Sequence, residues 1–377
     1  MRGFICRSFL PLMPRTLSII QAMAITAGLT GLLYGLRFLT PDGADGWYIS
    51  ELIESDRQQF FYRSLLTVEL HRLVYFLSHP FGFDGWHAVA LSSSLAGAIA
   101  LQALWRTSRG PLFLAINIVA GSFLVFVGHV ENYAWVNAFF LLGFLWVRYW
   151  LRGEARAWPA LMFYALACLS HMLALFYLPA YVYLLYKKRD WHPLEILVPM
   201  LLFAGGVLVA PLFGQILGTD NGLQRLVPWF ETWARNHHFT FFSWAHWKML
   251  AYFHQRAAMG GLIPLGFEWE TLQSLWYSPV LYLGLPLELP LLLYFRKRIN
   301  TGFLQFLFVC VICGLCWTTL WHPDWGPLDW DLFSQFAIPL HVLFGLLVSD
   351  GRTTQSTHTR DTVAGRPGGG SGSHSGA

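Results

Sequence analysis

Long apolar stretches recur along the whole chain, and they constrain its fold more than any other feature. An α-helix needs about 20 mostly apolar residues to cross the hydrocarbon core of a bilayer. Candidate stretches lie at 16–39, 86–105, 111–127, 133–150, 157–170, 172–186, 194–217, 273–295, 302–320 and 332–349. The sequence leaves open whether the short stretches 157–170 and 172–186 are two spans or one re-entrant pair. We therefore predict an all-α, polytopic membrane protein with about ten transmembrane helices.

Composition excludes several other classes of protein. Of 377 residues, 55% are hydrophobic and only 12% are charged, whereas soluble domains contain about 25% charged residues. The net charge of +4 is too small to indicate nucleic-acid binding. The spacing of Cys310, Cys313 and Cys316 could suggest a metal site, but they lie in one apolar stretch, which favours packing. No HExxH, P-loop or GxSxG motif is present, so the usual metalloprotease, nucleotide and hydrolase sites are not supported.

Basic residues predict the orientation of the spans, because Lys and Arg concentrate in cytoplasmic loops. With ten spans and a cytoplasmic N-terminus, every inner segment is basic. These residues are Arg2, Arg7, Arg15, Arg106, Arg109, Arg152, Arg156, Lys187, Lys188, Arg189, Arg296, Lys297, Arg298, Arg352, Arg360 and Arg366. The outer loop 40–85 instead contains seven acidic and three basic residues. We therefore predict cytoplasmic N- and C-termini, with a bacterial inner membrane as the simplest setting.

The predicted membrane region divides the chain into three parts. Residues 1–15 form a cytoplasmic N-terminal segment, residues 16–349 a transmembrane catalytic domain, and residues 350–377 a cytoplasmic tail. The tail ends in GRPGGGSGSHSGA, which cannot bury a core, and we predict that it is disordered. The outer loops of the transmembrane domain are 40–85, 218–272 and 321–331.

Two segments of the outer loops have the pattern of helices that lie in the membrane interface. An apolar stripe with helical spacing runs through 65–77, at Leu66, Leu70, Leu73, Val74 and Leu77. Such a stripe can rest in the headgroup layer while the opposite face meets water. Stretch 241–256 shows a weaker form of the pattern. We expect these helices to wall a cleft at the lipid–water boundary, where a lipid-linked substrate enters from the side.

Acidic, imidazole and tryptophan side chains gather in the predicted outer segments. The candidates are the carboxylates Asp45, Glu131, Asp329 and Asp331, the histidines His129, His171, His237 and His238, the arginines Arg57, Arg63 and Arg72, and Tyr133. Ionisable groups at membrane depth are costly and indicate function. Their position on one face favours an active site there over a transporter, whose charges would lie at mid-span.

Each candidate also has a structural interpretation. Asp45 lies in the Gly-rich turn DGADG, where Asp commonly caps the local backbone. Glu131 precedes a predicted helix and can favour its dipole. His171 lies in an apolar context that suits packing. His237 and His238 are adjacent, which is poor spacing for one metal ion and favours a surface or phosphate contact.

Four short segments carry a resemblance to a known superfamily. They are ADGWYISELIES at Asp45, GHVENYAWV at Glu131, SHMLALFYLP at His171 and DWDLFSQFAIP at Asp331. Together with the acidic first loop, they resemble the GT-C superfamily of integral membrane glycosyltransferases, which use polyprenyl-phosphate sugars. The resemblance covers most of 16–349. The acid at Asp45 is not followed at once by a second acid, a departure from the common form of the superfamily.

The resemblance implies an inverting sugar transfer on the extracytoplasmic face. Asp45 would be the base that takes the proton of the acceptor, and Glu131 or Asp331 would orient the acceptor or hold a divalent cation. Arg57, Arg63 and Arg72 would contact the phosphate of the donor. The expected partners are a lipid-linked sugar donor, membrane lipid and an acceptor that the sequence does not specify.

Other functions remain open from the sequence. Glu288, between Pro286 and Pro290, is an acid at predicted mid-span, which is typical of a transporter or flippase for a lipid-linked sugar. A non-catalytic subunit of a glycan assembly complex is a further alternative. A membrane hydrolase with a His/Asp metal site is less well supported, because no pair of ligands has helical spacing.

Overall fold

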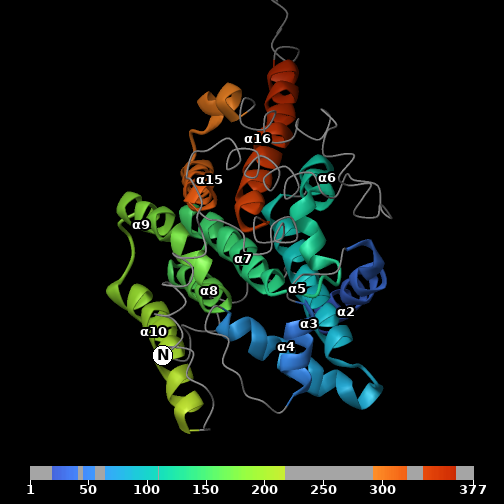
Figure 1. Ribbon diagram of the computed structural model, residues 1–377. Helices are drawn as coiled ribbons and strands as arrows, with labels where there is room; N and C mark the ends of the chain where they lie inside the picture. Colours follow the sequence, from blue (N-terminus) through green and yellow to red (C-terminus); the bar gives the residue numbers. More distant parts are fainter. Residues whose placement is uncertain are drawn as a thin grey trace, which may run out of the picture.

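A computed structural model describes residues 19–40, 46–55, 64–108, 110–216, 292–320 and 334–361, and these residues are helical without any strand. The α-helices are α2 (Ile19–Gly35), α3 (Gly46–Glu54), α4 (Leu65–Ser78), α5 (Gly85–Thr107), α6 (Pro111–Val119), α7 (Tyr133–Leu151), α8 (Trp158–Ser170), α9 (Leu178–Lys187), α10 (Pro193–Ile216), α15 (Gly302–Leu320) and α16 (Ser334–Asp361) (Figure 1). Short 3-10 helices are η2 (Arg37–Leu39), η3 (His79–Phe81), η4 (Gly121–Phe126), η5 (Met172–Tyr177) and η8 (Phe295–Arg298). The predicted all-α class is confirmed.

Helices occupy every predicted apolar range within the described residues, whereas most of 273–295 lies outside them. Among the described helices, only α5 and α7 are long and apolar enough to cross a membrane by length and composition alone. Six shorter apolar helical segments, of 10–17 residues, are Ile20–Gly35, Trp158–Ser170, Met172–Lys187, Pro193–Val207, Gly302–Thr318 and Ser334–Ser349. The prediction of ten spans therefore stays a prediction.

Two predicted ranges are divided into smaller helices. In 111–127, helix α6 ends at Val119 because Ala120 has an extended backbone, with φ −61° and ψ 141°, and η4 follows. In 172–186, η5 precedes α9, which begins with a proline in its first turn, at Pro179. Proline is tolerated in a first turn but breaks a helix interior, so it separates the two elements.

The long helices run in alternating directions, so the chain returns to the same two ends of a bundle. At one end, Gly302 lies against Leu151, and the Ala157 amide donates to Glu195 Oε2 at 3.1 Å. At the other end, Asn137 Nδ2 donates to Ser334 Oγ at 2.7 Å. Helix α8 runs from the first end to the second, where the chain reverses direction, and α9 returns to the first end.

The charges separate between these two ends. The first, which we call the basic end, contains Arg106, Arg152, Arg156, Lys187, Lys188, Arg189, Arg296, Lys297 and Arg298. It also contains the acids Glu154, Asp190 and Glu195, each paired with one of those cations. The second, which we call the acidic end, contains Glu51, Glu54, Glu69, Asp84 and Glu131, together with Arg37 and Arg72. This separation matches the alternation of signs predicted from the sequence.

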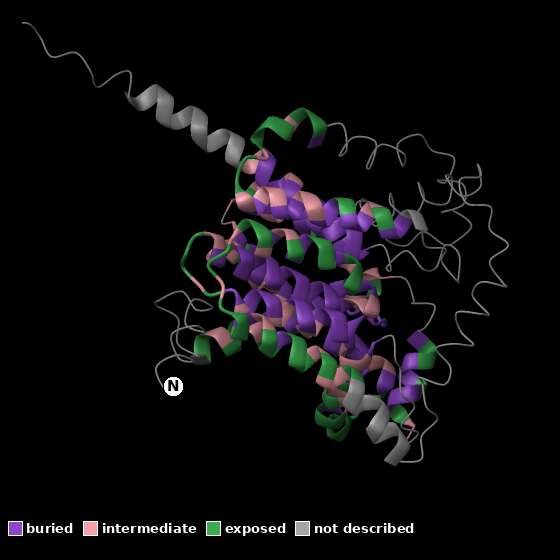
Figure 2. Cartoon of the chain, turned by 90° about the vertical axis from the view of Figure 1, so that its left-hand side faces the viewer, coloured by how far each residue is buried: buried purple, intermediate pink, exposed green. Residues whose placement is uncertain are grey.

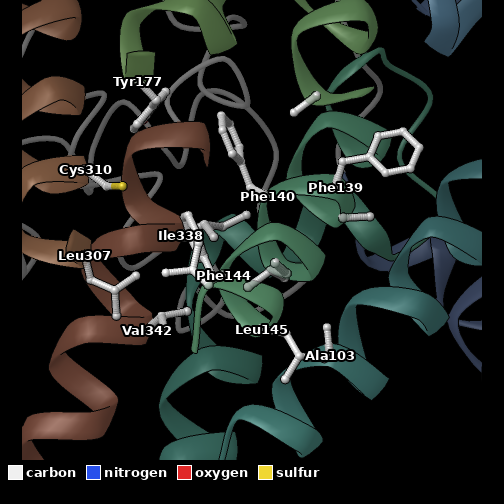
Figure 3. Packing of buried hydrophobic residues seen from close by; sticks show 14 of the residues in the cluster. Ala103, Phe139, Phe140, Phe144, Leu145, Tyr177, Leu307, Cys310, Ile338 and Val342 are labelled. Atoms are coloured by element: carbon white, nitrogen blue, oxygen red, sulfur yellow. The ribbon is translucent and has the colours of Figure 1, made fainter. Parts of the chain in front are cut away.

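Helix α7 forms the centre of the bundle. Its Phe140 and Phe144 pack with Ile338 and Val342 of α16 in one continuous cluster (Figure 3). Buried residues concentrate on the central helices, and exposed residues lie on the outer helices (Figure 2). Small buried residues of α5 allow close approach: a Cβ on Gly97 would lie 2.6 Å from Phe126 Cβ. Close packing of small residues is the usual means by which helices associate in lipid.

The outward faces of the bundle are apolar. Ile20 of α2 is 78% exposed and Leu201 of α10 is 61% exposed. Inside, by contrast, Ser92, Ser93 and Ser94 of α5 are fully buried. Apolar residues outside and hydroxyls inside are the reverse of a water-soluble helix bundle.

Helix α16 extends past the predicted apolar range 332–349. It continues to Asp361, past residue 350, where we expected a disordered tail to begin. No proline occurs between residue 350 and Pro367, and Gly351 does not end the helix; residues 362–377 lie outside the described part. Pro339 lies inside α16 and has no N–H for the Gln335 carbonyl, which instead accepts from the Tyr177 hydroxyl at 2.8 Å.

Gly128 gives a first testable prediction. Its φ is +69°, and a Cβ there would lie 2.5 Å from Arg37 Cβ. We expect Gly128→Ala to destabilise the protein by about 2 kcal/mol or more, from left-handed strain and overlap with Arg37 of η2. Thermal unfolding in detergent measures the effect. Gly82→Ala is the matched control, because Gly82 has φ +85° but nothing within 4 Å. An equal loss in both variants would show that contact with Arg37 is unimportant.

Candidate functional site

Helix α4 lies at the acidic end with its polar face turned inward. Thr67 and His71 of this helix, and Ser64 directly before it, are fully buried, whereas Phe76 is 76% exposed. Spacings of three and four residues place the three polar side chains on one helical face. The predicted apolar stripe divides: Leu66 and Leu70 pack partly against the core, and Leu73 and Leu77 are exposed. The interior at α4 is therefore polar.

The polar face of α4 meets the end of α8. Thr67 Oγ1 donates to the Ser170 carbonyl at 2.9 Å. His171 ends α8 with an extended backbone, and its Nδ1 accepts from the Leu173 amide at 3.3 Å. Both Ser170 and His171 are buried. The reversal of the chain after α8 thus places polar groups against α4.

The turn before α7 completes the cluster. His129, Glu131 and Asn132 of this turn are buried at 1–4% exposure. The Tyr133 ring lies 5.2 Å from the His171 ring, centroid to centroid. The main chain of Glu131 approaches His71 without meeting the geometry of a hydrogen bond. Three segments distant in sequence therefore meet, and we call this the polar cluster: Ser64, Thr67, His71, His129, Glu131, Asn132, Tyr133, Ser170 and His171.

Several buried atoms of the polar cluster have no hydrogen-bond partner among the described residues. They are Ser64 Oγ, His71 Nδ1, His71 Nε2, Asn132 Oδ1 and Ser170 Oγ. A buried polar atom without a partner costs about 1–3 kcal/mol, and most such atoms in proteins are satisfied. A ligand that carries hydroxyl groups can both donate to and accept from these atoms.

Helix α3 is packed against the same turn. A Cβ on Gly46 would lie 2.7 Å from the Val130 carbonyl oxygen and 3.1 Å from the Trp86 ring. Below it, Ile49 and Ile53 pack with Val130 in a small apolar cluster. Glycine is therefore required where α3 begins, and the beginning of α3 lies beside the turn that contains Glu131.

The structure brings together four predicted site residues, His129, Glu131, Tyr133 and His171. Arg72 directly follows His71 in the sequence. Its side chain is partly exposed and forms a 2.6 Å ion pair with Glu69 of the same helix. Other candidates lie outside the described residues: Asp45, Arg57, Arg63, His237, His238, Asp329 and Asp331.

The sequence analysis missed His71, Asn132, Ser64 and Ser170. The signal for His71 was its spacing of four residues from Thr67, on the flank of the leucine stripe of 65–77. An amphipathic pattern distinguishes the faces of a helix without showing which one is covered. No local pattern marks Ser64 or Ser170.

No group of three His, Cys, Asp or Glu side chains in the described part of the chain is placed to hold a metal ion. Cys310 and Cys313 are buried in α15, as expected for packing residues, whereas Cys316 is exposed. No family model, curated protein or solved structure matches the chain.

His71 gives a prediction on pH. Burial lowers its pKa to about 4, against an opposing effect of the Glu131 main chain. The unfolded chain binds this proton below about pH 6.5 and the folded chain only below about pH 4, so stability falls as pH falls through this window. The expected loss from pH 7 to pH 4 is about 3 kcal/mol.

Thermal unfolding of wild type and His71→Gln across pH 4–7 measures this effect. The variant should lose most of the acid-dependent decrease in midpoint that His71 contributes. His79→Gln, which changes an exposed histidine at the end of the same helix, is the control. An unchanged pH profile in His71→Gln would contradict the burial of a neutral imidazole.

Proposed function

We propose that the chain is an integral membrane glycosyltransferase that moves a sugar from a polyprenyl-phosphate donor to an acceptor on the extracytoplasmic face. One observation carries the proposal: Gly46 lies against the carbonyl of Val130. Asp45 directly precedes Gly46, and Glu131 directly follows Val130. Because consecutive Cα atoms are about 3.8 Å apart, two predicted site carboxylates are attached to backbone segments that are in contact.

The distribution of charge and apolar surface supports a membrane setting. The basic residues of the basic end and the acidic residues of the acidic end fit a bundle oriented by the positive-inside rule. The apolar outward faces of α2 and α10 suit contact with lipid. The acidic end then faces away from the cytoplasm, and the basic end faces it.

Cysteine labelling tests this orientation. In a cysteine-free variant, a cysteine at Glu69 should react with a membrane-impermeant maleimide in intact spheroplasts, because Glu69 is exposed at the acidic end. A cysteine at Glu154, exposed at the basic end, should react only after permeabilisation. Labelling in the opposite order would reverse the orientation and place the polar cluster on the cytoplasmic side.

The arrangement suits a donor with an apolar chain and a polar head. Leu73, Phe76 and Leu77 expose an apolar face of α4 to the lipid tail. The inward face of the same helix presents Ser64 and His71 to the polar interior. The polar head of the donor would enter on this side, while the lipid chain stays outside.

The chemistry requires one proton acceptor and one charged leaving group. The acceptor hydroxyl attacks the anomeric carbon, the bond from that carbon to the phosphate oxygen breaks, and polyprenyl phosphate leaves with the bonding electrons. The proton of the hydroxyl passes to Asp45 as general base. Glu131 holds the acceptor hydroxyl in line. Cations of the outer loops, among them Arg57 and Arg63, stabilise the leaving phosphate.

The direct test is turnover. Purified protein in detergent or nanodiscs is incubated with polyprenyl-phosphate sugars and a panel of hydroxyl acceptors, and released polyprenyl phosphate is measured. Sugar-dependent release supports the proposal. Movement of an intact donor across proteoliposomes without release of phosphate would instead favour a flippase, the alternative suggested by Glu288, which lies outside the described residues. A working pathway after alanine replaces Asp45, Glu131 and Asp331 together would favour a non-catalytic subunit.

A further inference from the structure

A second group of buried polar side chains lies one helical turn deeper along α7. Asn137 follows Tyr133 by four residues, so both occupy one face of α7, about 6 Å apart along its axis. Asn137 Nδ2 donates to Ser334 Oγ at 2.7 Å, at the beginning of α16. Asn137 Oδ1 has no partner among the described residues. This group thus continues inward from the polar cluster.

Gln335 directly follows Ser334, the hydrogen-bond partner of Asn137. It is fully buried, and within the described part of the chain neither its amide nitrogen nor its amide oxygen has a partner. Its backbone is fixed, because the carbonyl freed by Pro339 accepts from Tyr177 at 2.8 Å. Tyr177, whose ring is visible in Figure 3, also accepts from Trp317 Nε1 at 3.4 Å. A rigid backbone therefore carries a buried primary amide whose hydrogen-bonding capacity is unused.

The chemistry of these groups defines the ligand they fit. An amide offers both a donor and an acceptor, as does each hydroxyl of a sugar. Among the described residues, the groups that hydrogen-bond around Gln335 are uncharged: Asn137, Ser334, Tyr177 and Trp317. A phosphate or carboxylate would require a cation or charge-assisted donors. An uncharged, hydroxyl-rich ring meets these requirements.

We propose that Gln335 and Asn137 form a recognition subsite for the uncharged sugar ring of the donor and determine which sugar is accepted. The inference rests on the proposed transfer function and identifies the residues that recognise the sugar. The role of the subsite differs from that of the reacting carboxylates: it selects the ring by hydrogen bonds and takes no part in proton transfer. A site built to hydrogen-bond a hydroxyl rejects ligands that lack it, because its buried polar groups would stay unpaired.

The variant Gln335→Leu distinguishes an effect on sugar recognition from an effect on folding. Without ligand, the variant should unfold about 2 °C higher than wild type, because an unpartnered buried amide is replaced by an apolar side chain of similar size. In binding assays, the variant should show a smaller preference for the sugar-bearing lipid over the lipid phosphate without a sugar. Gln335→Glu is the second variant: it keeps the shape and removes the amide donor.

The binding assay compares farnesyl phosphate with farnesyl phosphate that carries glucose, mannose, arabinose or N-acetylglucosamine. For the sugar that binds best, wild type should bind the sugar-bearing lipid at least tenfold more tightly than bare farnesyl phosphate. Both Gln335 variants should lose this ratio and keep their affinity for farnesyl phosphate. Gln102→Leu is the control, because Gln102 already donates to Thr26 Oγ1 at 2.9 Å, remote from the acidic end.

Two results would overturn the subsite, and they are distinguishable. If the Gln335 variants keep the wild-type ratio, the subsite is wrong and the proposed transfer function is untouched. If wild type itself shows no preference for any sugar-bearing lipid, the subsite and the proposed donor class fail together.

Discussion

Asp45→Asn is expected to lower the rate of sugar transfer by about 10²–10⁴-fold, the usual contribution of a general base. Asparagine has nearly the same size as aspartate but cannot take the proton of the acceptor hydroxyl. Donor binding depends on other groups, so KM for the lipid-linked sugar should change little while kcat falls. Initial rates of polyprenyl phosphate release, with thermal unfolding as a check on folding, measure the effect.

Asp42→Asn is the matched control for this variant. Asp42 and Asp45 lie in the same Gly-rich turn, TPDGADG, so both changes remove one negative charge from one short segment. Only the loss of Asp45 should abolish transfer, because its neighbour Gly46 lies against the turn of Glu131. Equal and small effects in both variants would remove Asp45 from the mechanism. A large effect in Asp42→Asn alone would indicate that Asp42, not Asp45, is the general base.

Much of the fold was predictable because helix signals are local. Apolar length located the helices, and prolines confirm several of their starts: α6, α8 and α9 all contain a proline in the first turn. The alternation of charge between the loops predicted which helix ends lie together. Gly302 beside Leu151, and Ser334 beside Asn137, are compatible with that alternation, whereas the membrane orientation stays a prediction.

The polar cluster was only half predictable, for a physical reason. His129, Glu131, Tyr133 and His171 were recognisable because polar residues are conspicuous at the ends of apolar stretches. His71 was not, because it lies within a helix whose composition is compatible with either an exposed or a buried face. The same holds for Gln335, which belongs to the second polar group. Which face is covered depends on tertiary packing. For α4 the covered face includes Thr67, Val68 and His71, which the apolar stripe alone does not predict.

Gly46→Ala is expected to lower kcat by about 10²-fold, although no reacting group is changed. A Cβ at this position would lie 2.7 Å from the Val130 carbonyl oxygen, and a backbone carbonyl cannot swing aside as a flexible side chain can. Either α3 or the turn that contains Glu131 must shift. Displacement of a catalytic group by about 1 Å can cost 10²-fold in rate.

Gly35→Ala provides the comparison. A Cβ on Gly35, the last residue of α2, would meet nothing within 4 Å, so this variant should keep the wild-type rate. If Gly46→Ala also transfers sugar at the wild-type rate while it remains folded, contact between α3 and the turn does not position the reacting carboxylates. The proposal that Asp45 and Glu131 act in one site would then lose its main support, since the approach of their backbone segments at Gly46 and Val130 is what brings them together.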